Sequence, residues 1–142
     1  MPVIEAEPSL LEFLRSEEAV YAYQHYQVLR WRCSFPETPS SAFVDYARTV
    51  SDSERSAYYL RSTARLFLGR FGTASDIDKL ADSYASAQND LEQAEILCSI
   101  QRMEKGRRNA ILGQSASDGF LTEYAVKLVR EERGSTVWGI TA

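Results

Sequence analysis

The sequence predicts an all-α fold of stacked antiparallel helical hairpins, and three observations favour it. Apolar residues recur at helical spacing along most of the 142-residue chain, whereas the alternation typical of a strand is nearly absent. Short loops separate the helical stretches, which makes successive helices antiparallel. In the second half, a unit of roughly thirty residues recurs, and a fixed period of this size is typical of stacked hairpins that cannot bury their apolar faces alone.

Each repeat unit carries an alanine that is followed by an apolar pair. Residues 60–68, 90–98 and 121–129 align on this pattern. The aligned residues are Ala64, Ala94 and Ala125, with the pairs Phe67–Leu68, Leu97–Cys98 and Leu128–Val129. We therefore expect Ala64, Phe67, Leu97 and Leu128 to be buried.

The first third of the chain begins with residues 1–8, which we expect to be an extended, acidic lead-in. Ser9 and Glu12 have the spacing of a capping box, and Ser16 followed by two acids gives a second helix start. One broken helix, or two abutting helices, should therefore fill roughly residues 9–33 and cap the N-terminal side of the domain. Pro39 suits the first position of a short helix that carries Phe43, Tyr46 and Ala47.

The central helices are bounded by two more capping boxes and a glycine. Ser51 with Glu54 predicts the start of a long helix, and Gly72 predicts its end as a left-handed cap. Thr73 with Asp76 predicts the start of the next helix.

The remaining helices have similar signals. Asn89 or Asp90 should open a helix that Gly106 ends, and a short helix should follow over residues 107–114.

The last helix should be capped by Ser117 or Asp118 and end at Gly134. We expect a single helical domain over residues 9–133 and a tail over 134–142.

A family resemblance rests on Arg61–Gly72 (RSTARLFLGRFG) and the following Ser75–Leu80 (SDIDKL). These segments resemble a HEAT-like repeat over about residues 53–132, with a small alanine and a leucine-rich stripe on the first helix, a glycine turn and a short second helix. The loop proline and the Asp/Val/Arg pattern of that family are mostly absent, so a HEAT-like fold without true repeats is the alternative.

The Arg-rich helix pair that follows an aromatic helix is also similar to the C-terminal helical extension of some bacterial reverse transcriptases. That resemblance implies an accessory domain of such a polymerase. It implies no catalysis, because the YxDD motif of the polymerase does not occur in the sequence.

Composition limits the classes of function. The net charge is −4, so the chain has no overall basic character for nucleic acid, although a local basic face is compatible with it. Cys33 and Cys98 lack a CxxC partner or a histidine cluster, which predicts packed, reduced thiols. The N-terminus does not resemble a signal peptide, and no apolar run approaches the roughly 20 residues of a membrane span. We therefore expect a cytoplasmic protein that binds no membrane.

Two groups of cations are candidate binding residues. Six of them form a candidate basic stripe, namely Arg61, Arg65, Arg102, Lys105, Arg107 and Arg108. If these six side chains share one face of the domain, they would bind the phosphates of a nucleic acid. The alternatives are that the last four complement the negative end of a helix dipole, or that all six are scattered and solvated.

The second group is the aromatic patch Arg30–Trp31–Arg32, in which the indole would stack on bases and the guanidinium groups would hold phosphates. The alternative is that Trp31 belongs to the core and the arginines are solvated.

Residues with catalytic chemistry are isolated in the sequence. His25 has no nucleophile placed beside it, and Asp76 and Asp78 lie at a helix start, where acids interact with the dipole. We predict no catalytic residue, no metal site and no cofactor. The sequence is best interpreted as a non-enzymatic helical module that binds a protein partner or a neighbouring domain. A nucleic-acid-binding accessory domain of a reverse-transcriptase-like protein is the alternative, and an enzyme is a third class.

Overall fold

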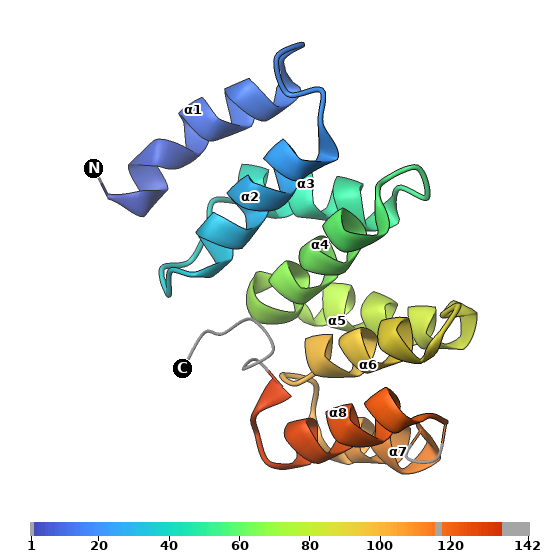
Figure 1. The fold of residues 1–142 in the computed structure, drawn as a ribbon. Coiled ribbons are helices and arrows are strands. Elements are labelled where there is room, and N and C mark those ends of the chain that lie inside the picture. Colours follow the sequence, from blue (N-terminus) through green and yellow to red (C-terminus); the bar gives the residue numbers. More distant parts are fainter. Residues whose placement is uncertain (1, 116–117, 135–142) are drawn as a thin grey trace. The chain divides into compact units, whose positions relative to one another are not determined.

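The computed structural model describes residues 2–115 and 118–134, and in these ranges every regular element is a helix (Figure 1). The elements are α1 (Val3–Arg15), α2 (Ala22–Cys33), α3 (Ser41–Asp52), α4 (Tyr58–Phe71), α5 (Ala74–Asp82), the short 3₁₀ helix η1 (Ser83–Ser86), α6 (Asp90–Ser99), α7 (Lys105–Ser115) and α8 (Phe120–Arg130). The predicted all-α class is confirmed. The predicted Ser117 cap and residues 135–142 of the predicted tail lie outside the described residues.

The contacts divide the chain into an N-terminal unit, Met1–Phe67, and a C-terminal unit, Leu68–Ala142, with the boundary inside α4. The single domain over residues 9–133 stays a prediction.

In the N-terminal unit, α1 packs against α2 and α3. Its buried face consists of Val3, Glu7, Leu11 and Leu14, at the four- and three-residue spacing of a helix. A second cluster forms around the fully buried rings of Phe43 and Phe67, whose centroids are 5.6 Å apart.

The extended lead-in predicted over residues 1–8 is wrong, because α1 begins at Val3. Glu7 is a buried member of the helical stripe, and a distant arginine neutralises it, so its charge does not signal exposure. Pro8 lies inside α1 on the exposed side, as does Ile4, whose carbonyl the missing proline N–H would have met. The hydrogen bond that the proline removes therefore lies on the exposed side of α1.

Two predicted capping boxes also fail. Ser9 lies within α1, and Ser51 lies in the last turn of α3, so neither begins a helix. The helix predicted to start near Ser16 begins instead at Ala22, where the Tyr21 N–H donates to Gln24 Oε1 at 3.0 Å.

In the C-terminal unit, α6 packs along α8, while α5 lies beside α6 and α7 beside α8. The helices α6 and α8 run in the same direction, because hydrogen bonds join the start of α6 to the start of α8 and the end of α6 to the end of α8. Asp90 at the start of α6 accepts the backbone N–H groups of Leu121 and Thr122 at the start of α8, at 2.7 and 2.9 Å. Beyond the end of α6, Gln101 donates to the carbonyl of Val129 near the end of α8 at 3.1 Å.

The aligned residues of the repeat are buried as predicted, namely Ala64, Phe67, Leu97 and Leu128. The Thr73–Asp76 capping box and the Asn89 cap are also confirmed, with the Asp76 N–H on Thr73 Oγ1 at 3.3 Å and the Glu92 N–H on Asn89 Oδ1 at 2.9 Å.

The glycines act differently from the prediction. Gly72 does follow α4, but it has no left-handed φ. A Cβ there would lie 2.5 Å from the Leu68 carbonyl oxygen and 2.9 Å from Asp76, so the glycine permits a close approach of α4 and α5. Gly106 lies inside α7, because the Glu104 carboxylate accepts the N–H groups of Gly106 and Arg107 and starts that helix.

The end of α8 is a Schellman turn centred on Glu132, not on the predicted Gly134. Glu132 has a φ of 60°, and the Arg133 N–H bonds to the Leu128 carbonyl at 2.7 Å. A non-glycine residue accepts this conformation here because its carboxylate is held by Arg108 at 3.2 Å.

Candidate functional site

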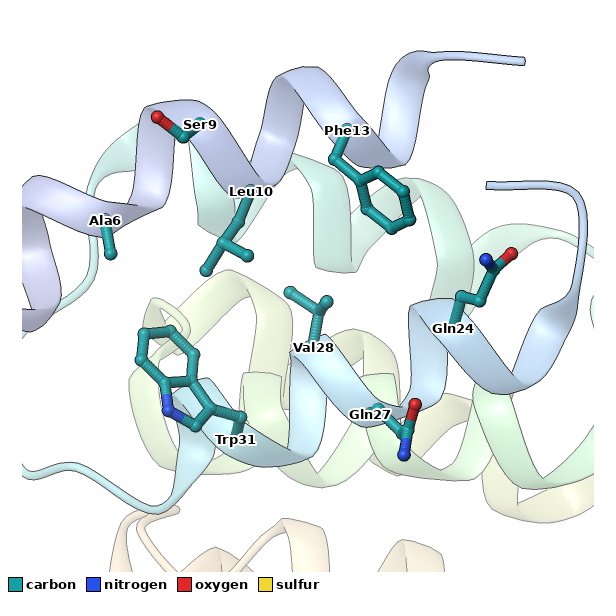
Figure 2. A pocket seen from close by; sticks show the side chains of 8 residues that line it. All are labelled: Ala6, Ser9, Leu10, Phe13, Gln24, Gln27, Val28 and Trp31. Carbon is teal, nitrogen blue, oxygen red and sulfur yellow. The ribbon is translucent and has the colours of Figure 1, made fainter. Parts of the chain in front are cut away.

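An apolar groove of about 640 Å³ runs between α1 and α2 (Figure 2). Its lining residues are Ala6, Ser9, Leu10 and Phe13 from α1, and Gln24, Gln27, Val28 and Trp31 from α2. The two helices are antiparallel, so Ala6 lies toward the Trp31 end and Phe13 toward the Gln24 end (Figure 2). We call this feature the α1/α2 groove.

Both walls of the groove follow one helical pattern. The four α1 residues and the four α2 residues each have the spacing i, i+3, i+4 and i+7, which places each set on one face of its helix. On α1 this face is distinct from the buried face that contains Leu11 and Leu14. The sequence interpretation missed the α1 set, although the spacing that reveals it was present.

Trp31 lines the groove. It is neither a core residue nor a fully exposed stacking surface, the two alternatives that the sequence suggested. Its side chain is 37% exposed, and its ring meets Phe35 edge to face with centroids 5.2 Å apart. The two arginines that flank Trp31 differ in burial, since Arg30 is exposed and Arg32 is fully buried. Residues two apart on a helix differ by about 200°, so the two guanidinium groups of the aromatic patch leave the helix on different sides.

The buried Arg32 joins three parts of the N-terminal unit. Its Nε lies 2.5 Å from Glu7 Oε1 on α1, and its Nη2 donates to the Glu37 carbonyl at 2.6 Å. The other Glu7 oxygen accepts the Ser40 N–H at 3.0 Å, at the start of α3. Burial raises the pKa of Glu7, but the hydrogen bonds from Arg32 and Ser40 outweigh it, so the pKa lies below its ordinary value.

The candidate basic stripe is divided between the two units. In the N-terminal unit Arg61 is half-buried and Arg65 is buried. In the C-terminal unit the four cations are held by acceptors of that unit. The acceptors of Arg102 are the carbonyls of Gly69 and Gly72 at the end of α4, at 2.7 and 2.8 Å. Arg102 therefore does complement a helix C-terminus, although the helix is α4 rather than α6, which Arg102 follows.

The other three cations form ion pairs. Arg107 pairs with Asp78, and both line a small pocket with Arg102. The guanidinium of Arg108 is buried and donates to the Gln101 carbonyl at 3.0 Å and to Glu132 at 3.2 Å. Lys105 Nζ lies 3.9 Å from Glu132. The Arg108 hydrogen bond is the main cause that lowers the pKa of Glu132. Phosphate binding by the six residues stays a prediction.

A second, smaller apolar groove of about 190 Å³ lies between α6 and α8. Leu91, Leu121 and Tyr124 line it and are exposed. Cys98 also lines it. Burial raises the pKa of its thiol to about 12, and the nearby Glu95 carboxylate adds to the rise, which keeps this thiol protonated and unreactive at neutral pH.

His25 serves the packing of the N-terminal unit. Its Nδ1 meets the Tyr46 hydroxyl, and its Nε2 meets the Ala19 carbonyl at 3.0 Å. A neutral ring that donates from Nε2 and accepts at Nδ1 satisfies both contacts. Burial raises the pKa of Tyr46.

Within residues 2–115 and 118–134, no three His, Cys, Asp or Glu side chains are grouped as metal ligands would be. None of the helices in these ranges is long and apolar enough to span a bilayer.

Comparison with known proteins finds no matching family model, no matching curated protein and no matching solved structure. The HEAT-like and reverse-transcriptase resemblances therefore stay hypotheses from the sequence.

Proposed function

We propose that this chain is a non-enzymatic helical interaction module that binds a protein partner, or a neighbouring domain of a larger assembly, in the α1/α2 groove. The observation that carries the proposal is an open groove with apolar walls from Leu10, Phe13, Val28 and Trp31. Exposed apolar grooves between helices are typical sites for protein segments. The half-exposed Trp31 is the kind of aromatic residue that contributes most to such interfaces.

We infer further that the C-terminal unit is a stack of HEAT-like hairpins. Its long-range hydrogen bonds support this, because they join residues about one repeat apart. Arg102 and Gly72 are separated by 30 residues, Asp90 and Thr122 by 32, and Gln101 and Val129 by 28. The parallel course of α6 and α8 is that of equivalent helices in adjacent hairpins. The buried side chains of Cys33 and Cys98 fit a reducing, cytoplasmic setting, which is part of the proposal.

The candidate basic stripe favours a protein partner over nucleic acid. Phosphate contacts need guanidinium or ammonium groups that face solvent. Arg65 and Arg108 are buried, and the exposed Arg102, Lys105 and Arg107 are already engaged by carbonyls or carboxylates of their own unit.

Site-specific photocrosslinking in the native cell tests the proposal. A photoreactive phenylalanine at Gln27, which lines the groove, should form an adduct with a protein, whereas the same residue at exposed Gln114 on α7 should not. Filling the groove with Ala6→Phe should abolish the adduct while the thermal melt stays unchanged. Adducts with nucleic acid at Gln27 would instead support the accessory-domain alternative, and equal adducts at both positions would overturn the proposal.

A further inference from the structure

The α1/α2 groove has an acidic edge on its α1 side. Glu5 lies four residues before the groove residue Ser9, and Glu12 lies three residues after it. Both are therefore neighbours of Ser9 on the helix surface, on the side of Ser9 that faces away from the groove. Both are exposed. At the Phe13 end, the backbone carbonyl of Glu18 accepts from Gln24 Nε2 at 3.3 Å, which places the main chain of this exposed residue beside the groove.

The α2 edge of the groove has the opposite charge. Arg30 lies three residues after Gln27, on the outer side of the α2 face, and is exposed. The groove therefore has an apolar floor, an anionic edge along α1 and a cation on the α2 edge. This asymmetry distinguishes one edge of any ligand from the other.

We propose that the groove binds an amphipathic α-helix whose apolar face is flanked by Lys or Arg on the edge that meets Glu5 and Glu12. This inference rests on the proposed function and names the class of partner. Two antiparallel helices leave a straight furrow between them, and a third helix packs into such a furrow through residues spaced i, i+3, i+4 and i+7. Since α1 has 13 residues, it spans about 20 Å, so a partner helix of similar length fills the groove.

The apolar floor and the charged edges have different roles. Burial of the partner's apolar side chains against Leu10, Phe13, Val28 and Trp31 gives affinity. The acidic edge gives preference, since a like charge opposite Glu5 or Glu12 is repelled and an opposite charge is attracted. Such a preference is screened by salt, whereas apolar affinity is not.

Two synthetic helical peptides of about 14 residues, a length matched to the groove, test this inference by fluorescence anisotropy. They share leucines at i, i+3, i+4 and i+7 and differ only on one edge, which carries either Lys or Glu. The wild-type protein should bind the Lys-edged peptide about ten-fold more tightly at low salt, and the ratio should approach one at about 1 M salt. The double variant Glu5→Lys/Glu12→Lys should reverse the preference.

A matched control separates the edge from the net charge. Glu54→Lys/Asp82→Lys changes two exposed acids outside the groove and should keep the wild-type preference. If both peptides bind equally and Ala6→Phe abolishes both, the groove binds protein helices but the acidic edge has no role, which overturns this inference and leaves the proposed function intact. If neither peptide binds and photocrosslinking at Gln27 is also negative, both fail. A mass measurement that shows self-association through the groove identifies a second copy as the occupant and also overturns the inference.

Discussion

The buried ion pair between Glu7 and Arg32 should be the most sensitive polar contact of the N-terminal unit. Glu7→Ala removes the carboxylate that lies 2.5 Å from Arg32 and leaves a fully buried guanidinium without its counter-charge. Breaking such a pair from one side costs about 3–5 kcal/mol of unfolding free energy. At roughly 3 °C per kcal/mol for a chain of this length, the melting temperature should fall by about 10–15 °C.

The assay is a double-mutant cycle measured by urea unfolding with circular dichroism. Glu7→Ala and Arg32→Met should each be strongly destabilising, whereas Glu7→Leu/Arg32→Met should cost far less than the sum, because no charge is left buried. Asp45→Ala is the control. Asp45 lies 2.6 Å from Arg48 in an exposed pair, and its loss should cost less than about 1 kcal/mol.

The same pair predicts a dependence on pH. The pKa of Glu7 is lowered in the folded chain from its ordinary 4.5. Its contribution to stability is therefore fully present above pH 4.5 and is lost as the pH falls through the lower folded pKa. The stability gap between wild type and Glu7→Gln should be constant near neutrality and shrink in acid. A gap that does not change with pH, or a Glu7→Ala cost no larger than that of Asp45→Ala, would refute this account of the pair.

Three further predictions concern packing, and unfolding free energies test all of them. Phe67→Ala should cost about 3–5 kcal/mol, because the ring is fully buried. Gly69→Ala should destabilise by about 1–3 kcal/mol, since its Cβ would lie 2.2 Å from a backbone oxygen of α6, whereas Gly113→Ala, with open space around it, should stabilise α7 by about 0.5–1 kcal/mol. Leu11→Ala on the buried face of α1 should cost about 2–5 kcal/mol, and Leu10→Gln on its groove face less than about 1.

Each of these three packing predictions has an outcome that would contradict it. A Phe67→Ala cost under about 1 kcal/mol would mean that the aligned stripe is not the core. Stabilisation by Gly69→Ala would show that α4 and α6 are not in close contact at this position. Equal costs at Leu10 and Leu11 would show that α1 has no open face.

The sequence was a good guide wherever the interaction was local. Thr73 and Asp76, or Asn89 and the backbone three residues later, meet because any helix start brings i and i+3 together. The buried repeat positions were predictable for a related reason, since helical periodicity alone assigns them to one face. The capping-box spacing was misleading at Ser9 and Ser51, because there it occurs inside a helix and no helix starts.

Sequence reasoning failed where the deciding partner is distant. Glu7 is neutralised by a residue 25 positions away, so its charge could not be recognised as part of a buried stripe. The start of α8 is capped by Asp90, whose carboxylate reaches the Leu121 N–H 31 positions away. The role of Arg102 likewise depends on the end of α4, which no local pattern identifies. Phosphate binding by the basic stripe stays a prediction, because clustering in sequence does not show what each guanidinium contacts.

The α1/α2 groove follows from how apolar residues are distributed on α1. A helix that is apolar on two faces is normally covered on both. Here Leu11 and Leu14 are covered within the N-terminal unit, while Leu10 and Phe13 border an open groove. An open apolar face with an acidic edge along it is therefore better suited to a covering helix of complementary charge than to bulk water.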